Sequence, residues 1–128
     1  MGDNHSTFNQ QVTRIFAALH RAHPATTNIK ISVAHGGVLE GSQEEIETMA
    51  ALCRGTILWL YQNEIISGEV NANGYMPDAQ LTARGYSIAR KQDRTNGIYV
   101  GAAAERAVDA NDARELAIIG ERIVSAIL

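Results

Sequence analysis

Apolar side chains recur at helical spacing in three long stretches of the chain. They stand three, four and seven positions apart in residues 8–21, and the same spacing returns in residues 42–65 and 112–128. Asn111 or Asp112 is placed to cap the last of these stretches, because a short polar side chain there can bind the free N–H groups of a helix start. The pattern predicts a mainly helical protein.

The second helical stretch carries both a start signal and an interruption. Ser42 and Glu45 have the S-x-x-E spacing of a capping box, in which each side chain binds the other residue's main-chain N–H. Gly55 then interrupts the pattern, because glycine weakens a helix interior. We therefore expect two helices that meet at an angle near Arg54 and Gly55.

Three shorter segments have the alternation or the turn residues of strands. Apolar and polar residues alternate in residues 28–33, which predicts a short half-buried strand or an extended connection. Residues 66–71 and 75–81 flank the dipeptide Asn73-Gly74, which is typical of tight hairpin turns. Pro77 has no N–H to donate, so we expect its strand at the edge of the sheet.

The remaining segments connect these elements. Residues 35–41 hold three glycines in seven positions and predict a loop. Thr82 is placed to cap a short helix that runs to about Arg90 or Lys91. Residues 98–108 are ambiguous between the end of a strand and an alanine-rich helix, so the pattern leaves the structure of residues 92–110 open.

Composition and charge narrow the class of protein. The 128 residues are 45% hydrophobic, enough for one domain with one core, and the net charge of −3 creates no general attraction to nucleic acid or anionic lipid. The single Cys53 cannot form an internal disulfide, and the first residues lack the features of a secretory signal. No apolar run approaches the roughly 20 residues that span a bilayer. These features predict a cytoplasmic protein that does not enter a membrane.

One segment resembles a known family. Residues 57–85 read as I-L-W-L-Y-Q-N-E-I-I, an N-G hairpin and L-T-x-x-G, and they are similar to the recognition helix and wing of the MarR-like and PadR-like transcriptional regulators. The order of elements before this segment is also that of winged helix domains. The resemblance implies an α+β, mainly helical fold: a single domain over residues 1–128, with a winged helix-turn-helix core over about 8–91 and an added C-terminal helical extension over about 98–128.

The same resemblance implies candidate DNA contacts. In the DNA-binding members a helix enters the major groove and basic side chains meet the phosphates. The candidates at the recognition helix are Arg54, Thr56, Gln62 and Asn63, of which the two amides could each make paired hydrogen bonds to adenine. However, Arg54 is the single basic residue between positions 54 and 78, against three carboxylates. This acidic wing disfavours nucleic acid as the partner.

A basic cluster follows the wing and offers a second possible phosphate contact. It consists of Arg84, Arg90, Lys91 and Arg94. A solvated helix face whose last-turn cations interact favourably with the helix dipole explains the cluster at least as well as a nucleic-acid patch does.

Catalytic and metal-binding chemistry is not predicted. His20, His23, His35 and Cys53 match no established zinc spacing, and no carboxylate pair stands beside a histidine or serine base in a catalytic arrangement. The glycines of residues 35–41 lack the following Lys-Ser/Thr of a phosphate-binding loop. We expect no enzyme, no cofactor and no metal.

The last helix is apolar over more than half of its circumference, which predicts a homodimer contact. The candidate interface residues are Leu116, Ile118, Ile119, Ile123, Val124 and Ile127. The alternative is a helix buried on both sides within its own domain.

The sequence as a whole favours a non-enzymatic winged helix module that binds protein partners or forms oligomers. The alternative is a DNA-binding transcriptional regulator of MarR-like or PadR-like type.

Overall fold

The computed structural model describes residues 4–71, 73–93 and 97–128. The predicted α+β, mainly helical fold is confirmed: helices dominate, and three short strands form one antiparallel sheet. In chain order the elements are α1 (Asn4–Ala22), β1 (Thr27–Ile29), α2 (Ile31–His35), α3 (Gln43–Gln62), β2 (Ile66–Ser67), β3 (Met76–Leu81), α4 (Ala83–Ala89), α5 (Val100–Ala110) and α6 (Ala113–Ile127).

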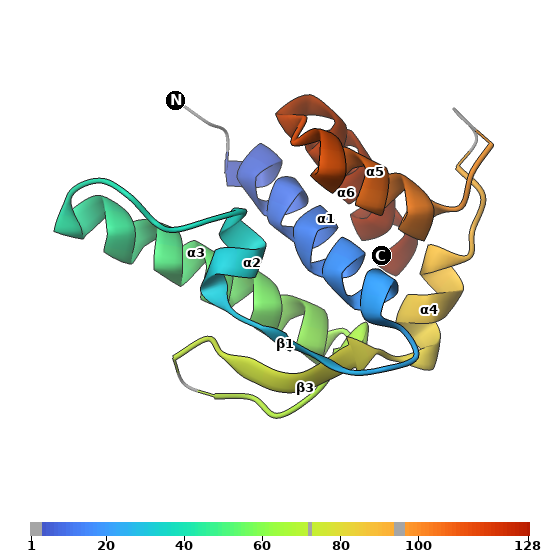
Figure 1. Cartoon of the computed structure of the whole chain (residues 1–128), viewed down its shortest axis with the longest axis horizontal. Coiled ribbons are helices and arrows are strands. Elements are labelled where there is room, and N and C mark those ends of the chain that lie inside the picture. Colours follow the sequence, from blue (N-terminus) through green and yellow to red (C-terminus); the bar gives the residue numbers. More distant parts are fainter. Residues whose placement is uncertain (1–3, 72, 94–96) are drawn as a thin grey trace.

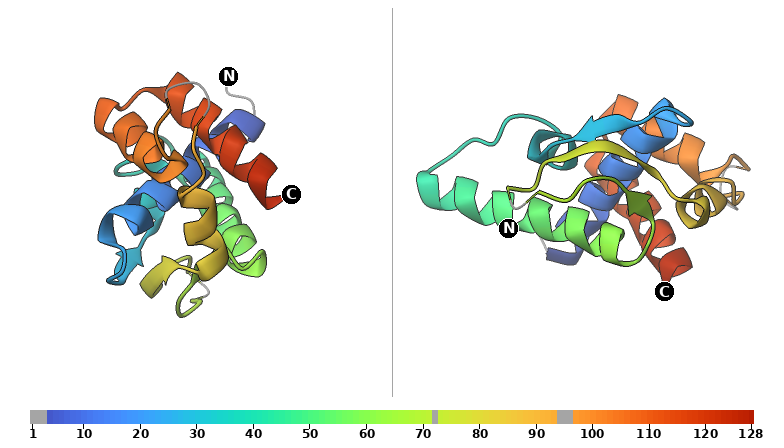
Figure 2. Two further views of the ribbon diagram at one scale, coloured as in Figure 1. Left: turned by 90° about the vertical axis from the view of Figure 1, so that its right-hand side faces the viewer. Right: turned by 90° about the horizontal axis from the view of Figure 1, so that it is seen from below.

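Helix α1 lies at the centre of the molecule (Figure 1). Helices α5 and α6 pack on one side of it, and α2, α3 and the sheet pack on the other. The helix predicted over residues 8–21 is confirmed and begins four residues earlier. The first turns of α3 project beyond the rest of the molecule (Figures 1 and 2).

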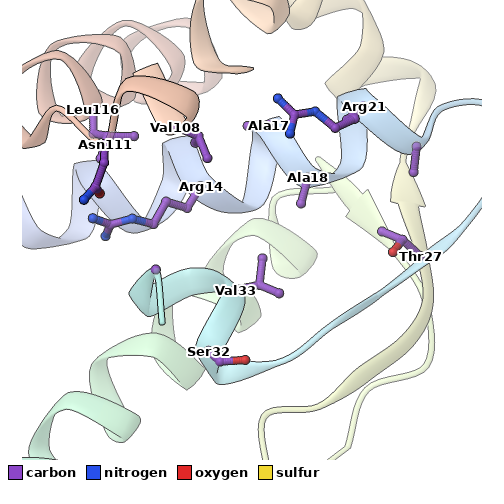
Figure 3. Close-up of a pocket in the computed structure, with 12 residues that line it drawn as sticks. Arg14, Ala17, Ala18, Arg21, Thr27, Ser32, Val33, Val108, Asn111 and Leu116 are labelled. Carbon is purple, nitrogen blue, oxygen red and sulfur yellow. The ribbon is translucent and has the colours of Figure 1, made fainter. Parts of the chain in front are cut away.

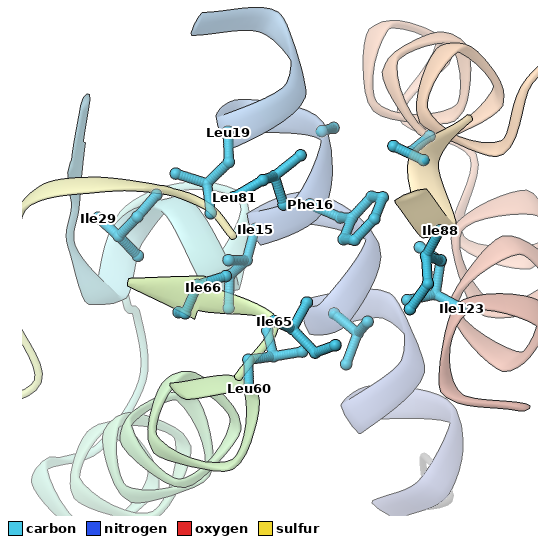
Figure 4. Packing of buried hydrophobic residues seen from close by; sticks show 14 of the residues in the cluster. Ile15, Phe16, Leu19, Ile29, Leu60, Ile65, Ile66, Leu81, Ile88 and Ile123 are labelled. Atoms are coloured by element: carbon cyan, nitrogen blue, oxygen red, sulfur yellow. The ribbon is translucent and has the colours of Figure 1, made fainter. Parts of the chain in front are cut away.

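One hydrophobic core joins all these elements (Figure 4). Ile15 and Phe16 of α1 are fully buried, as are Leu60 of α3 and Ile123 of α6. Ile65 lies between α3 and the sheet in the same cluster. The C-terminal helices are part of the main core, because buried residues of both helices belong to this same cluster. Burial of each such side chain contributes about 1.5–3 kcal/mol.

Helices α1 and α6 approach each other so closely that their main chains meet. A Cβ atom placed on Gly120 of α6 would overlap the main-chain oxygen of Asn9 in α1. Thr13 of α1 is buried nearby, and its hydroxyl donates a 2.6 Å hydrogen bond to the carbonyl of Leu116. Glycine at position 120 is therefore required by the packing of the two helices.

The strand order in the sheet is β1-β3-β2, so β3 is the central strand. The prediction that the strand of Pro77 lies at an edge is wrong. The ladder with β1 shifts register between Thr27, which pairs with Ala79, and Ile29, which pairs with Met76. Asp78 has a φ of +53° within this irregularity. A bulge of this kind places the proline where no ladder N–H is needed.

The strand predicted over residues 28–33 is shorter than expected. It ends at Ile29, and α2 begins at Ile31. The apolar alternation in this segment covers too few residues to separate a strand from a helical turn. Gly36 ends α2 with a φ of +87°, and its N–H donates to the carbonyl of Ser32.

Helix α3 is continuous, so the predicted break at Arg54 and Gly55 is wrong. Gly55 lies on the exposed side of the helix, where a Cβ would meet nothing within 4 Å. The missing side chain therefore costs helix propensity without opening a gap in the core. The predicted capping box of Ser42 and Glu45 is confirmed, with bonds of 3.1 Å and 2.9 Å.

The predicted hairpin is confirmed, with a longer connection than Asn73-Gly74 alone would give. Strands β2 and β3 pair antiparallel, and the connection covers residues 68–75. Of the turn dipeptide, Gly74 alone has a positive φ, +81°. The hydroxyl of Thr82 accepts a 3.0 Å bond from the N–H of Gly85, which confirms the predicted cap of α4.

The sequence left the structure of residues 92–110 undecided, and the described part of this segment is mostly helical. Tyr99 forms an isolated bridge with Gln92, and α5 follows from Val100. Asp112 caps α6 by accepting from two main-chain N–H groups, as predicted. None of the helices in the described ranges has both the length and the apolar character needed to cross a bilayer.

Candidate functional site

A groove opens between the exposed side of α3 and the hairpin loop. Leu58 of α3 and Val70 of the loop are 41% and 45% exposed, and both line it. The groove has a volume of about 270 Å³. We call it the α3–hairpin groove; its lining residues are Arg54, Gly55, Ile57, Leu58, Val70, Asn71, Gly74, Tyr75 and Met76.

Two glycines shape this groove. Gly55 leaves open space on the surface of α3 because it has no side chain. Gly74 is buried, and a Cβ there would overlap the side chain of Arg54, so the arginine lies against the turn of the hairpin. The result is an apolar hollow with one guanidinium at its border.

The surroundings of the groove are acidic. Glu64, Glu69 and Asp78 are exposed on and beside the hairpin. Glu44, Glu45 and Glu47 are exposed at the projecting start of α3, and hydrogen bonds from Ser42 lower the pKa of the Glu45 carboxyl. Arg54 is the single basic residue in positions 42–80. This surface would repel a phosphate backbone and attract cationic groups.

The predicted base-contacting residues do not form a reading surface. Thr56 is 3% exposed, and its hydroxyl donates 2.5 Å to Oε1 of Gln11, so it cannot reach a base. The amide of Asn63 donates to the carbonyl of Trp59 at the end of α3. Gln62 is exposed on the last turn, and Arg54 is half-buried in the groove. The helical spacing identified polar residues without showing which of them face inward.

The predicted basic cluster is divided among different structural contacts. Arg84 donates to the carbonyls of Asn63 and Ile127 at 2.5 Å and 2.7 Å. Arg90 lies over the ring of Tyr99, with 4.0 Å between its Cζ and the ring centroid. Lys91 is exposed. The fourth member, Arg94, lies outside the described residues.

The candidate interface residues of α6 separate into two groups. Leu116, Ile119, Ile123 and Ile127 are at most 5% exposed within the chain's own core, so they offer no surface to a second copy. Ile118 and Val124 are half-buried and line a hollow of about 470 Å³ beside Phe8.

Two of the histidines considered as metal ligands have other contacts. Nδ1 of His20 lies 2.5 Å from Oε2 of Glu105, and the ring of His23 stacks on Tyr86 at 4.2 Å. Cys53 is buried, and that burial raises the pKa of its thiol. In the part of the chain that the structure describes, no group of three or more potential ligands is arranged to hold a metal ion.

A second pocket, along α1, was not predicted from the sequence. It has a volume of about 650 Å³ and lies along α1, where Arg14, Ala18 and Arg21 share one face (Figure 3). Two arginines at positions i and i+7 with an alanine between them are a signal that could have indicated it. The apolar stripe on the opposite face of the same helix dominated the pattern.

Comparison of this chain with models of known protein families, with characterised proteins and with solved structures finds no match.

Proposed function

We propose that this protein is a non-enzymatic winged helix module that binds a protein partner through the α3–hairpin groove. The order of helix, strand, two helices and hairpin supports the winged helix assignment. The segments differ from those expected, since α2 and α3 supply the two helices and α3 is undivided. The observation that carries the binding proposal is the apolar groove with acidic surroundings.

The chemistry of the groove defines the partner. Leu58, Val70 and the space above Gly55 accept an apolar side chain. The exposed carboxylates of Glu69 and Asp78, which are close in sequence to lining residues, complement lysine or arginine beside that side chain. The proposed partner is therefore a protein segment with an apolar anchor flanked by basic residues.

Fluorescence anisotropy with designed peptides tests this proposal. We expect a peptide with a central leucine flanked by lysines to bind the full chain. Peptides with flanking glutamates, or with alanine in place of the leucine, should bind at least about tenfold more weakly.

A matched pair of variants locates the contact. Leu58→Lys removes an apolar contact and adds a repelling charge in the groove, so it should reduce peptide binding by at least about tenfold. Leu128→Lys makes the same change at a leucine that is 89% exposed and does not line the groove, and it should have no effect.

Three results would contradict the proposal. They are equal binding of the acidic and basic peptides, equal effects of the two lysine variants, and absence of binding by the basic peptide. A random DNA duplex is included in the same assay. Duplex binding that weakens steeply with salt would instead favour a DNA-binding regulator.

A further inference from the structure

The pocket along α1 is separate from the α3–hairpin groove and shares no lining residue with it. Its walls come from α1, the start of β1, α2 and the connection between α5 and α6 (Figure 3). The volume of about 650 Å³ is within the range of small-molecule sites.

Arg14 brings a positive charge into this pocket without a carboxylate to balance it. Its side chain is half-buried, and among the described residues Nη1 makes a long 3.5 Å bond to the carbonyl of Ala34. This burial lowers the pKa of the guanidinium. A half-buried cation costs free energy unless an anion approaches it.

Gly36 provides the space that Arg14 occupies. A Cβ on Gly36 would lie 2.6 Å from Nε of Arg14, and the glycine has a φ of +87° that other residues rarely adopt. The end of α2 is therefore shaped to hold the guanidinium in the pocket.

The second arginine of the pocket is already neutralised. Arg21 forms ion pairs of 3.1 Å with Glu105 and 2.9 Å with Asp109. Neither carboxylate lines the pocket, and the described lining residues include no acidic side chain. Of the two lining arginines, Arg14 is therefore the one without an ion pair to a carboxylate of the described residues, so its guanidinium is the group that a carboxylate ligand would meet.

The rest of the lining is suited to a small organic body. Ala18, Val33 and Val108 offer apolar contacts, and Thr27, Ser32 and Asn111 offer hydroxyl and amide groups. A guanidinium binds a carboxylate through two parallel hydrogen bonds. We propose that this pocket binds a small organic monocarboxylate, with Arg14 as the group that binds its carboxylate and the apolar wall as the contact for its hydrocarbon part.

Isothermal titration calorimetry on the full chain tests the proposal directly. The probes are butyrate, hexanoate, octanoate and benzoate, their neutral amides, and inorganic phosphate. We expect at least one carboxylate to bind with a Kd below about 1 mM and its amide to bind at least about tenfold more weakly. Phosphate should bind more weakly than the best carboxylate, because it has no hydrocarbon part to contact the apolar wall.

Variants of Arg14 and a matched arginine provide the control. Arg14→Gln should weaken carboxylate binding by at least about tenfold, and Arg14→Lys should have an intermediate effect because it keeps the charge and loses the paired geometry. Arg106→Gln changes an exposed arginine of α5 that does not line the pocket, and it should leave binding unchanged.

A thermal melt separates a binding role from a structural one. If Arg14 serves a ligand, Arg14→Gln removes an uncompensated charge and should melt at the wild-type temperature or above it. A clear decrease in melting temperature would assign Arg14 to the fold and overturn the proposal. Carboxylate binding that is absent, that is matched by the amides or that survives Arg14→Gln would also overturn it, as would binding of phosphate alone.

Discussion

The guanidinium of Arg84 donates a 2.7 Å hydrogen bond to the main-chain oxygen of Ile127, at the end of α6. The same side chain donates to the carbonyl of Asn63 at the end of α3. The last carbonyls of a helix have no partner within it, so one arginine on α4 satisfies two helix ends. Arg84 connects the end of the C-terminal helix to the end of α3.

Arg84→Gln should lower the free energy of unfolding by about 1–2 kcal/mol, because both helix-end bonds are lost. Urea denaturation measures this change. Arg114→Gln, at an exposed position in the first turn of α6, should change stability by less than about 0.5 kcal/mol. Equal effects would mean that the bonds of Arg84 contribute nothing. Charge reversal at Arg84 is accordingly a poor test of nucleic-acid binding, since it also disturbs the fold.

Thr82→Val should destabilise the protein by about 1 kcal/mol because it removes the cap of α4. The hydroxyl also donates 3.1 Å to the carbonyl of Ile65, so the substitution loses a bond to the preceding segment. Thr48→Val is the control, since Thr48 is exposed on α3 and bonds only within its own helix. A melting curve of Thr82→Val that coincides with wild type would refute the cap.

Two glycine-to-alanine substitutions should have opposite effects. Gly120→Ala places a methyl group against the main chain of Asn9 and should cost about 3 kcal/mol or more, because α1 and α6 must separate. Gly55→Ala adds a methyl group where nothing lies within 4 Å and should stabilise α3 by about 0.5–1 kcal/mol. Thermal melts of both variants check the prediction. A loss of stability in Gly55→Ala would argue that α3 bends at that position.

The buried thiol of Cys53 makes stability depend on alkaline pH. Burial raises the pKa of Cys53 in the folded protein. The contribution of the protonated thiol to the free energy of unfolding is therefore fully present below the ordinary thiol pKa of about 8.5, and it falls as the pH rises beyond that value. The stability advantage of wild type over Cys53→Ala should therefore shrink between about pH 7 and pH 10. Denaturation of both proteins across this range measures it. A constant difference would show that the thiol does not titrate on unfolding.

A homodimer through α6 stays a prediction, now restricted to Ile118 and Val124. Truncation after Asn111 would remove Ile119 and Ile123 from the core and so would not test it. Sedimentation analysis should instead find a dimer for wild type and a monomer for Ile118→Glu combined with Val124→Glu. The exposed pair Arg106→Gln and Arg114→Gln serves as a control with the same change in net charge. A wild-type monomer would end the idea.

The sequence predicted the elements that depend on local chemistry. The caps at Ser42, Thr82 and Asp112 involve neighbours within three positions, so their spacing was sufficient. The hairpin also depends on residues close in sequence, because β2 and β3 pair across a short connection. The position of Pro77 in the central strand depends instead on pairing with β1, some fifty residues away, which no local pattern contains.

The candidate site was predicted less well than the fold. Thr56 is a predicted DNA contact, yet its hydroxyl donates to the buried Gln11 in the core. The sequence does not indicate Arg14 as a site residue, because its pocket is formed by α1, the start of β1, α2 and the α5–α6 connection, which meet only in the folded chain. Burial of a polar residue is set by long-range packing, and periodicity within one helix does not determine it.

The contact between α1 and α6 has a consequence for how the chain folds. Thr13 of α1 donates to the carbonyl of Leu116, which lies 103 positions later in the chain. Helix α1 therefore meets α6, the helix that it contacts most extensively, only after most of the chain has been brought together. Mainly helical proteins usually fold fast because their contacts are local, and closing long loops first slows the search. This protein should therefore fold more slowly than its helix content suggests. In a nascent chain that still lacks residues 113–127, the surface of α1 that α6 covers is exposed.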